Sequence, residues 1–309
     1  VDLPDAEARV EETRFESTLN VSKRLSDQLT LQATLGAEYS EISQTGSSNV
    51  TRDFVRPKGF LSLNYKPTDD LFLSAKLERA VGQLRFFDFI ATVDVNQERE
   101  DVTNVNLVPP QSWEFTLEAQ QSLGKSGNLT LSLFYEDIED IVDRIPIEGG
   151  GQAPGNIDSA SAYGGFFDAT FLSDEFFWKG GRADLSFGYV NTEVEDPILG
   201  NTRKISGDFY KSYSLSLRQD FNETPWAIGA VVDYNEQAPS VRIDEVSFYN
   251  KSRGTLYVYA EHKDFFGLTV KAFAWNLLGA ENRFRRTVYS DRLNNEVLFS
   301  ERRSRRFGF

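Results

Sequence analysis

The only histidine of this chain, His262, is the first residue to consider for catalysis or metal binding. An imidazole can act as a general base or ligate a metal ion. Charged residues surround it (Glu261, Lys263 and Asp264), which is typical of a strand end beside a turn. A Ser-His-Asp triad would need His262, yet the sequence contains no Gly-x-Ser-x-Gly motif. We therefore favour a histidine that faces water, at the surface or in a lumen.

Three further segments have residue types that bind phosphate or metal ions, but their spacing is wrong. The Gly-Lys-Ser at 124–126 lacks the glycine that a phosphate loop needs five residues before its second glycine, and Ala119 stands there. We read this segment as a turn. The acidic clusters at 136–140 and 193–196 could bind divalent cations at loop tips. Neither matches the spacing of a calcium loop, so we favour solvated carboxylates.

The composition excludes other kinds of site. The absence of cysteine excludes a disulfide framework, a thiol nucleophile and a Cys-rich metal site. With 33 basic and 47 acidic residues the net charge is −14, which argues against a nucleic-acid partner, because binding phosphate backbones needs a basic surface. We expect no cofactor and no enzymatic activity. The chain begins at Val1 without a signal-like segment, so we expect a processed protein or an excised fragment.

The elements that must position any site are strands, because the dominant period of the sequence is two. Apolar and polar residues alternate over stretches such as 28–39, 112–120 and 226–234. Each such strand has one apolar and one polar face. We expect long loops near 85–111, 143–156, 195–206 and 238–252. About 14 strands are predicted, at residues 10–23, 28–43, 54–66, 70–84, 112–123, 128–142, 157–172, 180–194, 207–221, 225–237, 253–263, 267–276, 281–291 and 296–309.

The predicted strands suit a membrane β-barrel better than a soluble sheet. No window has the roughly 20 apolar residues of a transmembrane helix, so a membrane protein with this sequence would have to be a barrel. Most strands reach the ~9–11 residues of a tilted membrane strand. A soluble sandwich would show the same alternation with its apolar sides turned inward. Interfacial girdles are indicated by aromatic residues at the ends of apolar stripes: Tyr39, Tyr65, Trp113, Tyr135, Tyr189, Trp226 and Tyr234.

Several segments resemble TonB-dependent receptors of Gram-negative outer membranes. Residues 104–113, NVNLVPPQSW, are similar to the family's stretch of Asn, Leu, Pro and Trp that opens a strand after a long loop, although the family usually has Glu where Pro110 stands. Residues 134–142 resemble the family's pattern for the next strand. Residues 79–89 are similar to the family's Arg-rich strand end that precedes the long loop. The family-like positions in the first segment are Asn104, Leu107, Pro109 and Trp113.

The resemblance continues to the end of the chain. Residues 156–166, NIDSASAYGGF, resemble an Asn-x-x-x-Ala-x-x-Tyr-Gly pattern, with Phe166 in place of the usual Glu. Residues 276–289 resemble the last periplasmic turn of the family, which begins at Asn276. Four arginines crowd the final strand and depart from the pattern, so part of this strand is expected to face the lumen or lie outside lipid. The remaining family-like positions are Asn156, Ala160, Tyr163 and Gly164, and the terminal aromatic signal for barrel assembly is Phe307 and Phe309.

The resemblance implies an all-β, transmembrane, antiparallel up-and-down barrel in the outer membrane. Residues 1–309 would form a receptor-like barrel segment, part of a 22-stranded barrel whose N-terminal plug domain is absent from this sequence. The implied function is TonB-dependent uptake of a scarce ligand, with siderophores, cobalamin and glycans all fitting. The implied partners are outer-membrane lipid, the barrel-assembly machinery, TonB acting through the missing plug, and a small-molecule or glycan ligand.

Alternatives remain open at this point. The chain could be a smaller barrel that closes on itself. It could also be a binding or structural barrel without transport. An N-terminal plug with a TonB box, encoded in the full gene, would exclude this second alternative. An outer-membrane enzyme with its site at the barrel rim is disfavoured, because His262 has no convincing catalytic partner.

Overall fold

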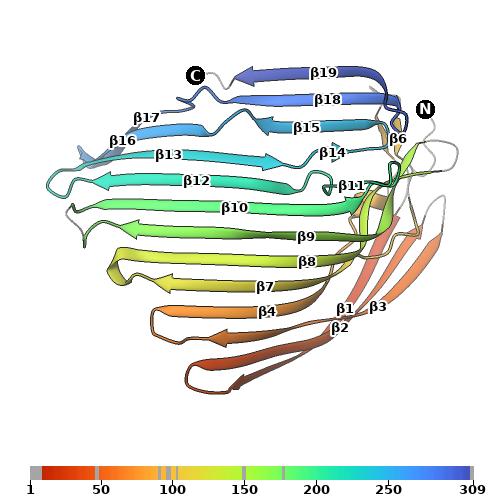
Figure 1. The fold of residues 1–309 in the computed structure, drawn as a ribbon, viewed down its shortest axis with the longest axis horizontal. Coiled ribbons are helices and arrows are strands. Elements are labelled where there is room, and N and C mark those ends of the chain that lie inside the picture. Colours follow the sequence, from red (N-terminus) through yellow and green to blue (C-terminus); the bar gives the residue numbers. More distant parts are fainter. Residues whose placement is uncertain are drawn as a thin grey trace.

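Antiparallel strands make up most of the molecule (Figure 1), which is a computed structural model describing residues 9–45, 49–89, 92–94, 99–101, 104–147, 151–175 and 178–306. Short 3-10 turns lie at Phe86–Phe89 (η1) and Gly124–Ser126 (η2). The long strands are β1 (Arg9–Arg24), β2 (Leu29–Thr45), β3 (Val50–Tyr65), β4 (Leu71–Val81), β7 (Gln111–Ser122), β8 (Gly127–Pro146), β9 (Gln152–Leu172), β10 (Gly181–Glu195), β12 (Phe209–Asp220), β13 (Trp226–Gln237), β16 (Thr255–Phe265), β18 (Glu281–Asp291) and β19 (Glu296–Arg306). The shorter strands are β5 (Thr92–Asp94), β6 (Arg99–Asp101), β11 (Thr202–Arg203), β14 (Ser240–Val241), β15 (Glu245–Lys251) and β17 (Leu268–Ala274).

The strands follow one another across the sheet in chain order, which is an up-and-down topology. The hydrogen-bonded order runs β1-β2-β3-β4-β7-β8-β9-β10-β12-β13-β16-β17, and β14-β15-β18-β19 forms a second set. Short turns join the strands at one end, as at residues 25–28, 66–70 and 123–126. Longer segments join them at the other end, including 82–110 and 196–208. We call these the short-turn end and the long-loop end.

The two sets of strands meet in a long interrupted hairpin. β13 pairs with β16 and also contacts β15, while β16 pairs with β17 and β15 pairs with β18. Hydrogen bonds bridge the interruption, from the Leu277 N–H to the Leu256 carbonyl at 3.1 Å and from the Ser252 N–H to the Glu281 carbonyl at 2.8 Å. β15 and β16 therefore lie end to end as one strand, and β17 and β18 return beside them.

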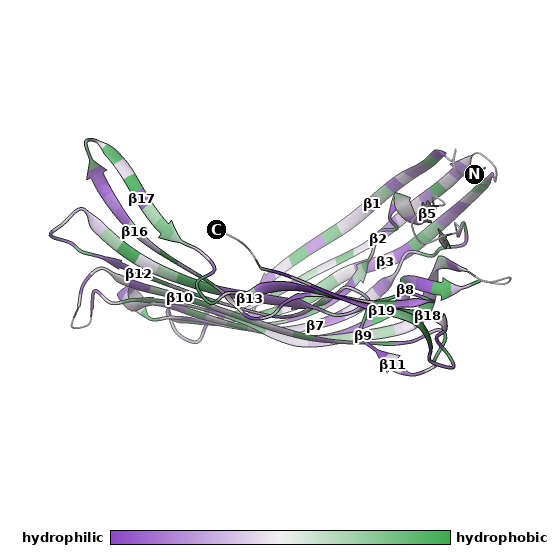
Figure 2. Ribbon diagram, turned by 90° about the horizontal axis from the view of Figure 1, so that it is seen from above, coloured by the Kyte–Doolittle hydropathy of each residue, from purple (hydrophilic) through white to green (hydrophobic). Residues whose placement is uncertain are grey.

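The sheet is curved but open. Figure 2 shows its two sides rising toward the same side of the molecule, as in a section of a barrel wall. Within the described ranges, β1 pairs with β2 alone and β19 with β18 alone, so the first and last strands do not close the sheet. Among the described residues, no helix is long and apolar enough to span a membrane.

The two faces of the sheet differ in polarity, as the period of two predicts. Cross-strand pairs place Leu131 opposite Phe167, Phe167 opposite Phe187 and Phe187 opposite Tyr213, so one face carries a continuous apolar band. We call this the outer face. Its large apolar side chains are solvent-exposed, and Leu133 retains 48% of its accessible surface. The polar partners on the opposite, inner face are more crowded, as expected for the concave side of a curved sheet.

The structure corrects four of the expectations. The predicted loop at 143–156 is wrong, because β8 extends to Pro146 and β9 starts at Gln152. The predicted loop at 238–252 is wrong as well, because it contains β14 and β15. Residues 276–289 do not form a turn between strands at the short-turn end, since they span the interruption between β17 and β18 and most of β18. All 14 predicted segments contain a strand, but β17 and β18 form one strand across the sheet, as do β15 and β16, so the described sheet has 13 strands and the predicted number of about 14 is one too high.

The assignment of the faces predicts opposite effects for arginine at neighbouring positions of β8. Leu133→Arg places a charge in the middle of the apolar outer face and should cost about 2–4 kcal/mol in the free energy of unfolding. The control Ser132→Arg places the same charge on the inner face opposite Glu118 and should change that free energy little. Urea titration of the full-length protein in lipid vesicles measures both, and equal losses for the two variants would contradict the assignment.

Candidate functional site on the inner face and at the long-loop end

Two aromatic rows border the apolar band of the outer face. Trp113, Tyr135, Tyr163 and Tyr189 are exposed on its long-loop side. The second row lies on the short-turn side of the band and consists of the exposed residues Tyr65, Trp226 and Phe265. Aromatic rings at these two levels are typical of the interfaces of a membrane barrel. The outer face is thus apolar between two aromatic rows, and the charged and polar side chains lie on the inner face and among the loops.

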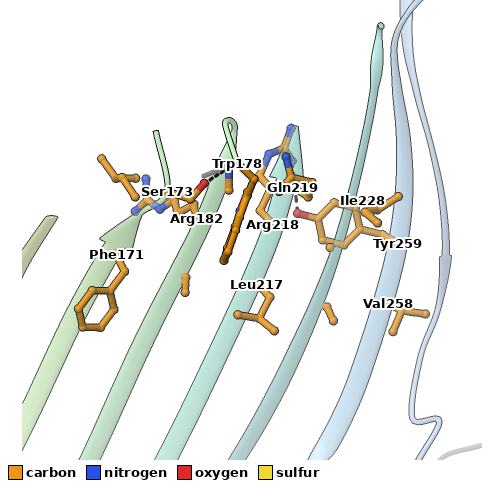
Figure 3. A pocket seen from close by; sticks show the side chains of 15 residues that line it. Phe171, Ser173, Trp178, Arg182, Leu217, Arg218, Gln219, Ile228, Val258 and Tyr259 are labelled. Atoms are coloured by element: carbon orange, nitrogen blue, oxygen red, sulfur yellow. Dashed lines mark hydrogen bonds between the residues drawn. The ribbon is translucent and has the colours of Figure 1, made fainter. Parts of the chain in front are cut away.

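The largest cavity opens on the outer face near the short-turn end. It has a volume of about 720 Å³. Figure 3 shows its walls on neighbouring strands, with Phe171 and Trp178 toward one side, Ile228 and Val258 toward the other, and Leu217 between them. Small residues such as Ala183 and Ala230 leave room between these side chains. Most of this lining is apolar, although Arg182, Arg218 and Gln219 line the cavity as well.

His262 also lies on the outer face and is partly exposed, so of the two expected settings, the surface and a lumen, the structure excludes the lumen. It is the cross-strand partner of Trp226, and the two rings meet edge to face at 4.7 Å. Phe265 makes a similar contact at 5.9 Å. The Nδ1 atom has no hydrogen-bond partner among the described residues. His262 therefore belongs to the aromatic row at the short-turn end.

Charged residues on the inner face form ion pairs across strands. Lys58 on β3 bridges Glu16 and Glu38 at 3.0 and 3.1 Å, and Arg14 reaches Glu38 at 2.8 Å. Glu38 is almost completely buried by these contacts. A second group, at the short-turn end, is centred on Arg218 and includes Asp220, Glu261, Lys263 and Tyr259. The inner face is therefore a charged wall on which these two groups of cations and anions are paired with each other.

Three phenylalanines interrupt this polar wall. Phe134, Phe166 and Phe209 form a row on the inner face, with ring centroids 6.1 Å apart at both steps. Gly188 lies beneath them, and a Cβ atom there would come within 2.9 Å of the Phe166 ring and 3.2 Å of the Phe209 ring. The glycine is needed for the rings to approach each other. Among the described residues, the row is one of two aromatic groups on the inner face, the other being Tyr257, Tyr259 and Phe273.

A buried ionic cluster ties the long loops together. Arg203 donates to Asp143 and to Asp196, both at 2.9 Å, and Arg292 pairs with Asp196 as well. Ser206 donates to Asp143 at 3.3 Å and accepts a hydrogen bond from the Val241 N–H at 3.2 Å. The cluster thus joins the end of β8, the loop after β10, the segment after β13 and the β18–β19 turn. Asp196 is only 2% exposed, so these pairs are shielded from water.

The electrostatics of this loop follow from burial. Burial raises the pKa of Asp196, but the N–H groups of Leu199 and Ile198 and the cations Arg292 and Arg203 more than offset this, so its pKa lies below the ordinary value. Asp196 is therefore a stable anion at neutral pH. In the same region, burial raises the pKa of Asp208 and lowers that of Lys204.

The structure brings several of the family-like positions together at the long-loop end. The Asn156 side chain accepts from the Val108 N–H at 2.9 Å and donates to the Val108 carbonyl at 2.8 Å, as a strand neighbour would. Asn104 donates to the Pro154 carbonyl at 3.0 Å. Leu107 is 1% exposed and Pro109 is also buried. Leu107 belongs to the one cluster of buried apolar residues in the described part of the chain, with Ile42, Leu84 and Phe89.

The other family-like positions lie apart from this group. Trp113 and Tyr163 are exposed on the outer face, where the Arg79 guanidinium lies 5.4 Å from the Trp113 ring centroid. Gly164 lets β9 approach β10, because a Cβ atom there would lie 2.1 Å from the Tyr189 carbonyl oxygen. Ala160 is buried, and Asn276 closes its own turn through bonds to Ala280. Phe307 and Phe309 lie outside the described residues.

No metal site emerges from the acidic clusters. Within the described ranges, no group of three or more acidic or histidine side chains is arranged to hold a metal ion. From the cluster at 193–196, Asp196 is committed to two arginines. The Gly-Lys-Ser at 124–126 is a tight turn between β7 and β8, as predicted.

The up-and-down sheet with an apolar outer face and a charged inner face agrees with a comparison against known families. A model described as "TonB dependent receptor-like, beta-barrel" matches residues 15–244. The chain belongs to the TonB-dependent receptor family. Members of this family are outer-membrane proteins of Gram-negative bacteria. No curated protein matches the chain.

Solved structures of this TonB-dependent receptor fold superpose on most of the chain. They include the copper transporter OprC (TM-score 0.68, 14% identity, 88% of this chain and 42% of that chain). The FrpB iron transporter from Neisseria meningitidis, F3-3 variant, superposes with a TM-score of 0.62 and 14% identity, over 90% of this chain and 40% of that chain. The ferric yersiniabactin uptake receptor FyuA from Yersinia pestis superposes with a TM-score of 0.62 and 13% identity, over 89% of this chain and 42% of that chain. The chain spans about two fifths of the length of these receptors, and at this identity the likeness shows the fold alone.

Sequence reasoning missed Arg203, Arg292 and Asp143, which complete the ionic cluster around Asp196. Each lies in or beside a predicted loop, and no local spacing relates them, because they are far apart along the chain. The available signal was the acidic run at 193–196 together with arginines in other loops. The order of the strands in the sheet decides which charged residues come into contact. The alternation of apolar and polar residues along one strand does not reveal that order.

Neutralising Asp196 should loosen the long loops. Asp196→Asn leaves the guanidiniums of Arg203 and Arg292 buried without their shared anion, and the expected cost is about 3 kcal/mol. Hydrogen–deuterium exchange should then rise in residues 196–208 and 238–244, and the urea midpoint of the full-length protein should fall. The control Asp27→Asn breaks the exposed pair with Arg24 and should cost less than about 1 kcal/mol.

The low pKa of Asp196 gives this test a pH signature. A depressed pKa means that the stabilisation is complete at neutral pH and is lost as pH falls below the ordinary aspartate value of about 3.9. Loop exchange in the unmodified protein should therefore increase as the pH falls below about 4, and Asp196→Asn should remove that step. An unchanged step in the variant would assign it to other groups.

Proposed function

We propose that this chain is the wall of an outer-membrane receptor that takes up a scarce ligand with energy from TonB, and that it is not an enzyme. The observation that carries the proposal is the pair of opposite faces: an exposed apolar band bordered by aromatic rows outside, and a charged wall inside. A ligand path needs a polar interior, and lipid needs an apolar exterior. Membership of the family supports the same placement.

The proposed ligand class is a metal ion or a metal chelate. The solved receptors that superpose on the chain are named as copper, iron and ferric yersiniabactin transporters, which favours this class over cobalamin and glycans. The row of Phe134, Phe166 and Phe209 is the surface that we propose for contact with the organic part of a chelate. TonB would act through a plug domain, and the barrel-assembly machinery and lipid complete the proposed partners.

The full-length protein should fractionate with outer membranes and show heat-modifiable mobility on gels, because a closed barrel resists unfolding by detergent until it is heated. Cells that produce it should also accumulate radiolabelled ferric siderophore or copper above background, and lose this accumulation without TonB. Recovery as a soluble periplasmic monomer would exclude the barrel. Accumulation that persists without TonB would exclude energised uptake while leaving the barrel in place.

A further inference from the structure

One of the final-strand arginines that depart from the family pattern, Arg302, lies at a pocket together with two arginines of β18. A cavity of about 490 Å³ lies over β15, β18 and β19. Arg283, Arg285 and Arg302 line it, and we call these three residues the arginine patch. The remaining lining residues are Glu236, Phe248, Asn250, Phe284, Arg303 and Ser304.

The strand register places the arginine patch on one face. Arg285 is directly opposite Phe248 on β15 and Arg302 on β19, and Arg283 is opposite Asn250 and Ser304. Cross-strand partners point to the same side of a sheet, so all three arginines share that side.

That face is the outer one. Glu236 lines the same pocket, and it accepts a hydrogen bond from the Tyr234 hydroxyl at 2.9 Å. Tyr234 stacks on Tyr213, which belongs to the exposed apolar band of the outer face. The patch is therefore continuous with the surface assigned to lipid, and it does not face the proposed ligand path.

The patch lies beyond the aromatic row on the long-loop side. β15 comes after the end of β13 at Gln237, and β18 and β19 join through the turn at 292–295, at the long-loop end. Figure 1 shows this turn beside the long loops. Arginine is costly at the middle of a bilayer but cheap near an interface, and this level is where lipid headgroups begin.

Within the described ranges, little acidic charge faces the patch. Arg285 and Arg302 are directly opposed, and like charges in a cross-strand pair destabilise a sheet. Neither has an acidic partner within 4 Å among the residues that the structure describes, and Arg283 has only Glu281 at 3.9 Å. The nearby Glu236 is engaged by Lys211 at 2.9 Å. The Arg285 guanidinium also lies 4.3 Å from the Phe248 ring centroid, so an apolar surface adjoins the charge.

We propose that the arginine patch binds the phosphate groups of a phosphorylated glycolipid of the outer leaflet, lipopolysaccharide. Guanidinium groups match phosphate geometry with paired N–H donors, and an anion between Arg285 and Arg302 relieves their repulsion. Phe248 offers a surface for the sugar or the base of an acyl chain. The proposal rests on the outer-membrane placement argued above, and its test includes a separate check of that placement.

The test compares Arg285→Gln/Arg302→Gln with a control that removes equal charge, Arg24→Gln/Arg182→Gln, in the full-length protein. The control arginines are exposed at the short-turn end and paired with Asp27 and Asp184. Purified lipopolysaccharide should bind the patch variant roughly tenfold or more weakly than the unmodified protein, and the control normally. Enzymatically dephosphorylated lipopolysaccharide should bind the unmodified protein as weakly as the phosphorylated form binds the patch variant.

Thermal unfolding provides a second readout. In lipopolysaccharide-free detergent the patch variant should unfold at a higher temperature than the unmodified protein, because the like-charge pair is gone. Added lipopolysaccharide should raise the unfolding temperature of the unmodified protein and of the control, but not of the patch variant.

Three results would overturn the proposal: equal binding by the patch variant, equal loss in the control, or full binding of dephosphorylated lipopolysaccharide. Competition by inorganic phosphate at the same affinity would assign the patch to a free anion and also refute the glycolipid. Outer-membrane fractionation and heat-modifiable mobility are recorded on the same samples. If these hold while lipopolysaccharide fails to bind, only this inference fails.

Discussion

Complete hydrogen bonding of the strand backbones is the constraint from which the rest of this molecule follows. Hydrocarbon offers no partner for an N–H or C=O group, so each strand in a membrane needs a neighbour on both sides. Pairing is continuous from β1 to β17 in one set of strands and from β14 through β15 and β18 to β19 in the second, so that along both sets mainly the side chains differ in the surface that they face. Successive side chains point to opposite faces of the sheet, and the apolar side chains on the outer face stay exposed. A soluble sandwich would bury these apolar sides against each other, whereas here the described dry cluster is limited to Ile42, Leu84, Phe89 and Leu107 at the long-loop end.

The long loops are held by charge more than by apolar packing. Within the described part of the chain, the loops beyond the aromatic row have neither a second sheet nor a lipid surface against which they could pack. The ionic cluster around Asp196 replaces that support, because one buried carboxylate serves Arg203 and Arg292 from two different segments. Asn156 contributes in a similar way by completing the backbone bonding of Val108. Such contacts are directional, so they define the positions of the loops in a way that nonspecific apolar collapse would not.

Much of the fold was predictable from the sequence, because alternation is a local property. All 14 predicted segments contain a strand, and the aromatic residues expected at the borders, such as Trp113 and Tyr135, lie there. Long-range properties were harder. The interruption within the β15–β18 hairpin depends on which strands are neighbours, and strand β15 is too short to stand out from a polar loop. The surroundings of His262 were missed because its charged sequence neighbours suggested water, while its spatial neighbours are Trp226 and Phe265.

The interrupted hairpin has a consequence for how insertions and deletions act on this protein. Val258 pairs with Ala274, and Lys251 pairs with Asn282. Between these two pairs the first strand has seven residue steps and its partner has eight. The additional residue in 275–280 shifts the phase of the alternation, so the lipid-side residues change from even numbers in β17 to odd numbers in β18. Deleting one residue there would exchange the two sides of β18, turning Arg283 and Arg285 toward the lumen and Phe284 and Arg286 toward lipid. The short segment that Asn276 closes thus decides on which side of the wall these charges act.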